Sequence, residues 1–318
     1  MASALPQRRE APLELRHPLW LRPPRNRRIM QSSRLMLVDA LGLVYRAFYA
    51  IPPLSTRNGT PTNALLGFVK TLRNLQRYWK PEFCAVVFDG GIPPERQELL
   101  PMYKAQRPPM PDPMRVQLPL IEEYLQCAGV AALRLDDMEA DDILAALAGH
   151  GAAAGLETLV VTADKDLMQI VTDKVSLIAP NKIEEKINPA AVAERTGVQP
   201  AQIPDWLALV GDTSDNIPGV PGVGPKTAAR WLAQWPDLET LLAHVSELQP
   251  EKSRQTLMEH AETARRNLRL MRLQLDLPGL PPLEALRPHR IETGRLLKFY
   301  LAYDLRGPAR ELSAPTLF

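Results

Sequence analysis

The chain has 318 residues, of which 45% are hydrophobic, so it is long enough to bury a core and to form two domains. No apolar run reaches the roughly 18 residues that a membrane-spanning helix needs, which argues against a membrane-embedded protein. The two cysteines form no CxxC pattern, there is no secretory signal, and the five scattered histidines lack zinc-ligand spacing. We therefore expect a soluble cytoplasmic protein with reduced thiols, and neither a zinc site nor a histidine base.

The net charge of +2 is distributed unevenly along the chain. Residues 1–34 contain eight arginines and two glutamates, about +6, whereas the remainder has 30 basic and 34 acidic residues, about −4. The first 33 residues are rich in proline and arginine and show no periodicity, so we expect a disordered basic tail. An annotated start upstream of the true one, a DNA-contacting arm and an organelle-targeting segment are the alternatives for this tail.

Apolar runs alternate with helical patterns between residues 34 and 185. They predict strands at 35–39, 83–89, 130–135, 157–162 and 175–179, and helices at 62–80, 114–127 and 140–154. This alternation is typical of a mainly parallel α/β sheet covered on both faces. Helical segments dominate after residue 186, so the predicted parts are the tail (1–33), an α/β core (34–185) and a helical region (186–318).

The segment 90–113 joins a predicted strand to a helix and has proline-rich ends. It is too long for an ordinary connection, and such loops are usually functional or disordered. It contains Arg96 and the basic stretch MYKAQR (102–107). If this stretch is helical, Tyr103, Lys104 and Arg107 lie within about one turn, and an aromatic beside two cations suits a single-stranded end or a scissile phosphate. A solvated charged loop is the alternative.

Acidic residues stand where three of the predicted strands end. Asp39 and Asp89 close the first two strands, while Asp164 and Asp166 follow the fourth. Because ligands of a parallel sheet bind beyond the carboxyl ends of its strands, these acids should converge on one edge. The motifs EADD and GDTSDN add five more acids: Glu139, Asp141, Asp142, Asp212 and Asp215.

Several carboxylates in one pocket need counter-charges. Two unit charges 4 Å apart repel by about 4 kcal/mol at an effective dielectric of 20, so either their pKa values rise or cations neutralise them. Oxygen ligands without histidine or cysteine favour Mg²⁺ or Mn²⁺, and two such ions can activate a water and stabilise the leaving oxygen of a phosphodiester. The alternative is that these nine acids are ordinary surface residues.

A glycine-rich turn, PGVGPKTA, leads into a predicted helix in the second half of the chain. Such a turn exposes backbone N–H groups to a phosphate, as in a helix–hairpin–helix that grips one strand without reading bases. A nucleotide-binding P-loop is rejected because Pro225 stands where that motif needs lysine and no strand precedes it. An ordinary connection between helices is the remaining alternative.

The motifs occur in the order VDA, YRAF, FDG, YKAQR, EADD, TADKD, GDTSDN and PGVGPKTA. In this order, residues 34–290 resemble the flap endonuclease/5′→3′ exonuclease family, most closely the nuclease domain at the N-terminus of bacterial DNA polymerase I. The resemblance implies a PIN-like 5′-nuclease core, a helical arch at 90–113 and a helix–hairpin–helix in the C-terminal region.

The resemblance also implies roles for individual residues. The first metal site would use Asp39, Asp89, Glu139 and Asp141, and the second Asp164, Asp166, Asp212 and Asp215, with Asp142 between them. Catalytic positions would be Lys104, Arg107 and Tyr103 in the arch, and the Tyr45–Arg46 pair near the first site. DNA contacts would come from the hairpin turn, with potassium bound there in many members, and from the arch: Gly222, Val223, Gly224, Lys226, Thr227 and Arg96.

The family hydrolyses phosphodiesters to leave 5′-phosphates, trims 5′ ends, and removes flaps or RNA primers. We therefore expect a metal-dependent nuclease acting in primer removal or DNA repair, as a monomer without a fused polymerase. Ala40 and Thr213 depart from the family pattern, in which Gly and Glu are frequent. A non-catalytic protein that binds branched DNA and a ribonuclease of related fold are the alternatives.

Overall fold

The computed structural model describes residues 33–313. Residues 1–32 and 314–318 lie outside this range, so the predicted disordered tail falls almost entirely outside the described residues. No helix within residues 33–313 combines the length and apolar composition needed to cross a bilayer.

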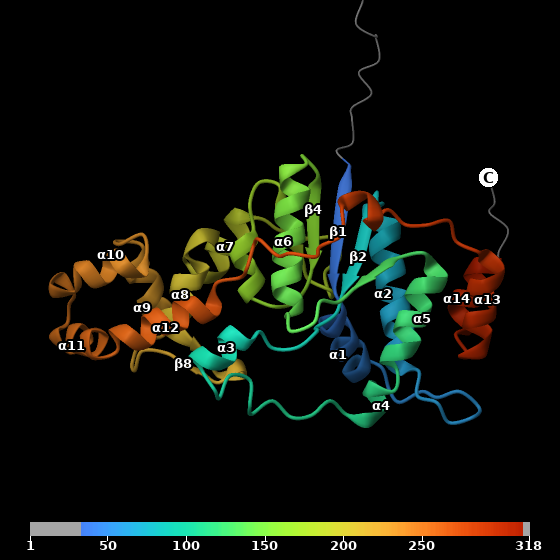
Figure 1. Cartoon of the computed structure of the whole chain (residues 1–318), viewed down its shortest axis with the longest axis horizontal. Helices are drawn as coiled ribbons and strands as arrows, with labels where there is room; N and C mark the ends of the chain where they lie inside the picture. The colour runs from blue at the N-terminus through green and yellow to red at the C-terminus, as the bar shows by residue number, and fades with distance from the viewer. Residues whose placement is uncertain (1–32, 314–318) are drawn as a thin grey trace, which may run out of the picture. The chain divides into compact units, whose positions relative to one another are not determined.

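A six-stranded sheet with the order β3-β2-β1-β4-β5-β6 forms the centre of the fold (Figure 1). The five strands from β3 to β5 are parallel, as predicted, whereas β6 pairs antiparallel with β5 at the edge. The sequence did not predict β6, because a strand of two residues carries no alternating pattern. The strands are β1 (Arg34–Asp39), β2 (Phe83–Val87), β3 (Ala131–Leu133), β4 (Glu157–Val161), β5 (Val175–Ile178) and β6 (Lys186–Ile187).

Successive residues of β1 point to opposite faces of the sheet, as the period of two requires. Leu35 and Leu37 pack into one hydrophobic core, and Met36 and Val38 pack into another. The first core includes α6, and the second includes α1, α2 and α5. These helices are α1 (Ala40–Ala50), α2 (Asn63–Trp79), α5 (Leu118–Ala128) and α6 (Ala140–Ala153).

The helices that follow the sheet do not pack as one group. Those from α7 to α12 extend the core that contains α6, whereas α13 packs through Phe299 and Tyr300 against Tyr124 of α5, in the other core (Figure 1). The same hydrophobic core therefore continues across residue 185. The division at that residue into an α/β core and a helical region stays a prediction. The helices are α7 (Pro189–Thr196), α8 (Ile203–Val210), α9 (Pro225–Leu232), α10 (Leu238–Ala243), α11 (Glu251–Glu259), α12 (Ala261–Met271), α13 (Thr293–Ala302) and α14 (Arg306–Ser313).

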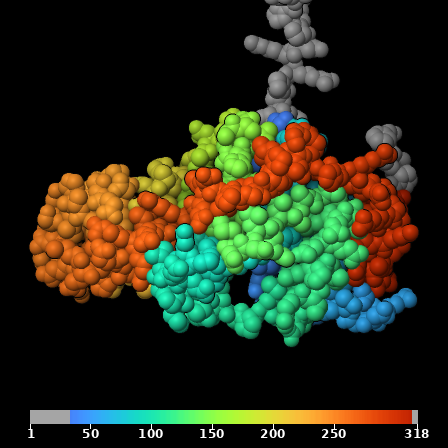
Figure 2. Space-filling model, in the orientation of Figure 1, coloured from blue at the N-terminus to red at the C-terminus, as the bar shows by residue number. Residues whose placement is uncertain are grey.

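The segment 90–113 contains two short helices, α3 (Pro94–Leu99) and α4 (Asp112–Arg115). The basic stretch between them is a series of turns in which Lys104 has a φ of 55°, so the helix considered for this stretch does not form. Its backbone is held by the chain at residues 213–216 instead: Lys104 N–H donates to the Asp215 carbonyl at 3.0 Å, and Asn216 Nδ2 donates to the Met102 carbonyl at 2.8 Å. Figure 2 shows a hollow bordered by this segment (turquoise to green), with atoms of α1 (blue) visible inside.

Candidate active site

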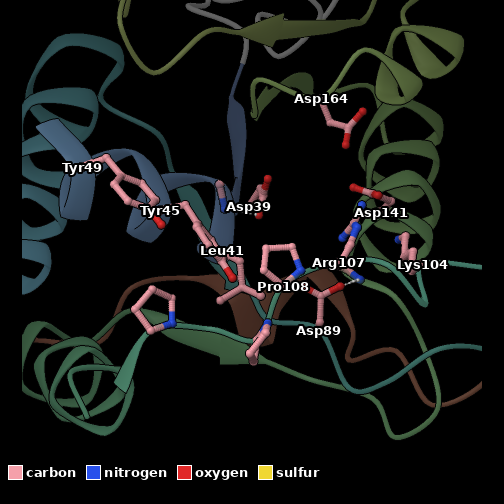
Figure 3. Close-up of a pocket in the computed structure, with 14 residues that line it drawn as sticks. Asp39, Leu41, Tyr45, Tyr49, Asp89, Lys104, Arg107, Pro108, Asp141 and Asp164 are labelled. Atoms are coloured by element: carbon pink, nitrogen blue, oxygen red, sulfur yellow. Dashed lines mark hydrogen bonds between the residues drawn. The ribbon is translucent and has the colours of Figure 1, made fainter. Parts of the chain in front are cut away.

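Four of the predicted metal ligands line one cavity of about 500 Å³ at the carboxyl edge of the sheet. Asp39 is the last residue of β1, Asp89 follows β2, Asp164 follows β4, and Asp141 lies in the first turn of α6 (Figure 3). The cavity is also lined by residues of α1 and by residues between 104 and 111 of the segment 90–113. The prediction that acids at strand ends converge on one edge is therefore confirmed.

The Asp39 carboxylate is fixed by the two elements beside it. As the N-cap of α1, it accepts a hydrogen bond from the Gly42 N–H at 2.9 Å, and Thr162 Oγ1 donates to its other oxygen at 3.2 Å. Side-chain oxygens at an N-cap commonly satisfy the free N–H groups of the first helical turn. Burial, together with the charges of Asp89 and Asp164, raises the pKa of Asp39 to about 6.

Asp89 and Asp141 are held by the start of α6. The N–H of Ala140 donates to Asp89 Oδ1 at 3.1 Å, which places that carboxylate at the positive end of the helix dipole. Burial raises the pKa of Asp141 well above its ordinary value, and the charges of Asp164 and Asp39 raise it further. Carboxylates that are this costly to ionise together either keep a proton or need a nearby cation.

Two cations of the crossing segment, Lys104 and Arg107, line the same cavity as the acids (Figure 3). The Lys104 ammonium pairs with Glu139 and lies 3.7 Å from Asp215, while Arg107 pairs with Asp215. Burial lowers the pKa of Lys104, but the Glu139 and Asp215 carboxylates outweigh it, so its pKa is raised and the ammonium stays charged. The cavity therefore contains both signs of charge, and Lys104 and Arg107 lie beside Asp141 (Figure 3).

Glu139 and Asp142 are buried beside the cavity and do not line it. Asp142 is 0% exposed and accepts two hydrogen bonds from Arg96, whose guanidinium also pairs with Glu139. Arg96 is itself only 5% exposed, so the prediction that it contacts DNA does not hold for this conformation. The sequence could not reveal this, because the ion pair joins residues more than 40 positions apart.

The remaining acids lie outside the cavity lining. Asp212 pairs with Lys165 at 3.0 Å and accepts hydrogen bonds from Ser214, and these partners lower its pKa even though burial opposes them. Burial, with the charges of Asp164 and Asp212, raises the pKa of Asp166 to about 8. The buried Asp166 Oδ1 has no hydrogen-bond partner among the described residues.

These acids are suitable ligands for hard divalent cations, although they are not yet arranged around one. Within residues 33–313, no three acidic, histidine or cysteine side chains lie close enough together to hold an ion. The ligand chemistry nevertheless fits, because the acids are all oxygen donors, three of them have strongly raised pKa values, and Asp166 Oδ1 has no hydrogen-bond partner among residues 33–313. Lys104, Arg107 and Lys165 now neutralise part of this charge.

The predicted aromatic and YR positions behave differently from one another. Tyr103 is 5% exposed and its hydroxyl donates to Glu139 and Asp215, so it is not available as the stacking aromatic that the sequence suggested. Tyr45 lines the cavity together with Tyr49, which is 70% exposed (Figure 3). Arg46 is exposed on α1 and does not line the cavity.

The glycine-rich turn leads directly into α9, as the motif predicts. Gly222 has a φ of 74°, which favours glycine, and Gly224 is the N-cap of α9. Lys226 is exposed in the first turn, Thr227 is half-buried, and Val223 is buried in the core. The turn follows α8 through a short hairpin of two-residue strands, β7 (Gly211–Asp212) and β8 (Ile217–Pro218).

Four residues near the site escaped prediction. Gly42 allows α1 to approach Asp39, Thr162 donates to Asp39, Tyr49 adds a second aromatic, and Lys165 pairs with Asp212. Thr162 and Lys165 both belong to the motif TADKD, so their position next to the acids was the available signal. The two departures from the family pattern lie close by: Ala40 is buried as the first residue of α1, and the Thr213 carbonyl accepts a hydrogen bond from Gln106.

Two family models match the chain. One, described as 5′-3′ exonuclease, N-terminal resolvase-like domain, covers residues 34–197, and the other, described as 5′-3′ exonuclease, C-terminal SAM fold, covers residues 198–293. A 5′-3′ exonuclease of Aquifex aeolicus is 42% identical over 217 residues, which are 68% of this chain and 75% of that protein. The thermostable DNA polymerase I of Thermus thermophilus is 38% identical over 294 residues, 89% of this chain but only 35% of the polymerase. The chain thus spans about a third of that polymerase.

Solved structures share the fold at low sequence identity. The bacteriophage T5 D15 protein, co-crystallised with metal ions, has a TM-score of 0.62 at 23% identity over 75% of this chain and 89% of that one. The catalytic core of Rad2 in complex with DNA substrate has a TM-score of 0.57 at 17% identity over 85% of this chain and 88% of that one. These likenesses confirm the predicted fold class.

Proposed function

Since the chain belongs to the 5′-3′ exonuclease family, whose members are hydrolases that act on DNA, we propose that it cleaves phosphodiesters at DNA 5′ ends and flaps with the help of divalent metal ions. One observation carries this proposal. Asp39, Asp89, Asp141 and Asp164 line the same cavity as Lys104 and Arg107. The acids suit metal ions and the cations suit a phosphate, so one cavity can bind both the metal ions and the phosphodiester that is hydrolysed.

Asp39, Asp89, Asp141 and Asp164 would hold a divalent ion from the cavity, with Glu139 beside them. Asp166, Asp212 and Asp215 would contribute to a second ion, which requires Lys165 and Arg107 to move away from them. Bound Mg²⁺ or Mn²⁺ would supply Lewis-acid polarisation of the phosphodiester and an activated water. A structural relative was crystallised with metal ions, and another with zinc, which supports a metal requirement here.

Lys104 and Arg107 would bind the scissile phosphate and its developing negative charge. Both side chains line the cavity, and Arg107 is half-exposed, so a phosphate can replace its present carboxylate partner. Arginine can pair with a phosphate through two parallel hydrogen bonds, whereas lysine acts as a point charge. Pairing with Glu139 and Asp215 orients the two cations before substrate arrives.

A 5′ end would reach the acids beneath the segment 90–113. Tyr45 and Tyr49 lie on the α1 side of the cavity with ring centroids 6.5 Å apart. Exposed aromatic rings stack on unpaired bases with little sequence preference, so this pair suits the first nucleotides of a single-stranded end. Pro108, Pro109 and Pro111 also line the cavity, and their fixed backbone angles restrict the movement of the segment 90–113.

Duplex DNA would lie against the start of α9. The turn Gly222–Gly224 precedes the helix, and Lys226 is exposed in its first turn. Backbone N–H groups at a helix N-terminus, with an adjacent lysine, bind a phosphate without reading the base. This position suits the duplex downstream of a flap. An RNA primer has the same phosphate backbone and fits the same contacts, and the turn also suits a potassium ion.

A cleavage assay tests this function directly. The substrate is a duplex with a labelled 5′ flap, incubated with the protein in Mg²⁺ and, separately, with a chelator. We expect cleavage near the flap junction only with Mg²⁺, leaving a 5′-phosphate that a ligase can join. Cleavage that survives chelation, or products with a 5′-hydroxyl, would rule out the proposed chemistry.

A further inference from the structure

Arg96 is a buried arginine inside a segment whose other basic residues face a cavity. It lies on α3, and its side chain is 7% exposed, against 12% for Lys104 and 49% for Arg107. Burying a charged guanidinium is costly unless it is paired and hydrogen-bonded. The position therefore requires a structural partner, and the structure provides one.

The partners of Arg96 come from two other elements. Nη1 and Nη2 donate to the two oxygens of Asp142 at 2.6 and 2.8 Å, and Nη1 also pairs with Glu139. Asp142 accepts a further hydrogen bond from the Gln274 N–H at 2.8 Å, and Arg96 lies 3.4 Å from the Arg272 carbonyl. One guanidinium thus joins the crossing segment, the start of α6 and the chain that follows α12.

These contacts leave Arg96 poorly placed for DNA. It does not line the cavity, and its Nη atoms are directed at buried carboxylates. Lys104 and Arg107, in contrast, reach the cavity and are more exposed, so a phosphate can exchange with their partners. The segment therefore contains two kinds of cation, one fixed and two exchangeable.

We propose that Arg96 is a positioning residue: it holds the Glu139 carboxylate in place to bind a metal ion, and Asp142 holds Arg96 in place. This inference rests on the proposed function, since it concerns how the same metal site is built. The bidentate Arg96–Asp142 pair fixes the guanidinium, and the fixed guanidinium restrains Glu139 beside the acids of the cavity. Groups that orient a ligand in this way commonly change metal affinity 10- to 100-fold when they are altered.

Positioning and simple charge balance make opposite predictions for a metal. Arg96 carries a positive charge, so its removal on electrostatic grounds alone would make the site more negative and tighten cation binding. If Arg96 positions Glu139, its removal loosens the ligand and weakens cation binding. Lysine at this position keeps the charge but loses the planar fork that binds two carboxylates at once.

The test is Mn²⁺ binding to the full chain without DNA, measured by titration calorimetry for Arg96→Lys and Arg96→Met. We expect both variants to bind Mn²⁺ about 10- to 100-fold more weakly than the unaltered protein, with Arg96→Lys the less affected. Gln97→Ala, exposed on the same helix, is the matched control and should bind normally. Unchanged affinity in Arg96→Lys, or tighter binding in Arg96→Met, overturns the proposal.

A double-variant cycle keeps the proposal testable if single variants lose stability. Asp142→Asn should weaken Mn²⁺ binding about as much as Arg96→Lys, and the double variant should be no weaker than the worse single one, because both changes break the same link. If the losses of Mn²⁺ affinity of the two single variants multiply in the double variant, the two residues act separately and the proposal is overturned.

DNA binding supplies a second readout that a structural defect would not mimic. In buffer without divalent metal, the slope of log affinity against log salt should be the same for Arg96→Lys, Arg96→Met and the unaltered protein. A phosphate contact by Arg96 would instead lower the slope of Arg96→Met by about 0.9 and would overturn the proposal. Absence of flap cleavage by the unaltered protein in Mg²⁺ would count against the proposed function, whereas the Mn²⁺ and salt measurements test the role of Arg96.

Discussion

The backbone N–H of Gly42 donates a hydrogen bond of 2.9 Å to Oδ1 of Asp39, so the first turn of α1 holds a carboxylate at the edge of the sheet. A Cβ atom on Gly42 would lie 2.3 Å from Oδ2 of the same carboxylate. Glycine at position 42 is thus a requirement of the site, since any side chain must displace Asp39.

We predict that Gly42→Ala slows flap cleavage by about 100-fold, because a displacement of about 1 Å of a catalytic group can cost that much. The change should have little effect on thermal stability, because alanine favours the helix while the clash opposes it. Gly149→Ala is the matched control: position 149 lies in α6 with open space around it, so alanine should stabilise the protein by about 0.5–1 kcal/mol and leave cleavage unchanged. Equal cleavage rates for the two variants would contradict this role for Gly42.

Lys104 and Lys226 should separate chemistry from binding. Lys104 lines the acidic cavity, so Lys104→Ala should lower the single-turnover rate at saturating DNA by about 100- to 1000-fold, with a small change in duplex affinity. Lys226 is exposed at the start of α9, so Lys226→Ala should weaken binding, reduce the salt slope by about 0.9 and spare the single-turnover rate. Equal losses of rate and affinity in Lys104→Ala would reduce Lys104 to a general phosphate contact.

The acids of the cavity should destabilise the metal-free protein. Burial and the charges of Asp89 and Asp164 oppose ionisation of Asp39, so Asp39→Asn should raise the melting temperature in a chelating buffer at pH 8. Added Mg²⁺ should stabilise the unaltered protein more than the variant, because an ion stabilises only the state that binds it. A variant that is less stable than the unaltered protein in chelator, or that gains equally from Mg²⁺, would contradict repulsion in the cavity.

Glu157 offers a pH test far from the metal ligands. It pairs with Arg34 at 2.6 Å and with Lys186, and these cations lower its pKa below the ordinary value of 4.5 although partial burial opposes them. A lowered folded-state pKa stabilises the protein above the unfolded pKa, and this contribution is lost as the pH falls through the folded pKa. Glu157→Gln should therefore reduce the free energy of unfolding by about 1 kcal/mol at pH 7, since the pair is partly exposed.

The difference between Glu157→Gln and the unaltered protein should shrink as the pH falls below 4.5, as measured by urea unfolding. The exposed Glu184→Gln is the control and should show no such dependence. A difference for Glu157→Gln that stays constant with pH would mean that the ion pair does not contribute.

The sequence predicted the sheet and the convergence of acids because both depend on local patterns. Apolar runs such as Phe83–Val87 identify buried strands, and an acid directly after a parallel strand must lie at the carboxyl edge. The order of the motifs then identified the family. Boundaries were close but not identical, as for the strand predicted at 83–89.

What the sequence could not predict depends on contacts between distant segments. Arg96 was interpreted as a DNA contact. Its burial against Asp142 arises only in the folded chain, so no local pattern of the sequence could indicate it. The stretch 102–107 was considered as a helix, but hydrogen bonds to residues 213–216 hold it in turns. The return of α13 to the other face of the sheet is likewise a matter of tertiary packing.

The most direct measurement of the central claim compares Asp89→Asn with Asp136→Asn in flap cleavage with Mg²⁺. Asp89 lines the cavity and accepts a hydrogen bond from the start of α6, whereas Asp136 is an exposed acid that does not line it. We predict that Asp89→Asn loses at least 100-fold in single-turnover rate while it still binds flap DNA, and that Asp136→Asn cleaves at the normal rate. Normal cleavage by Asp89→Asn would contradict a metal-dependent nuclease site built on the acids at the edge of this sheet.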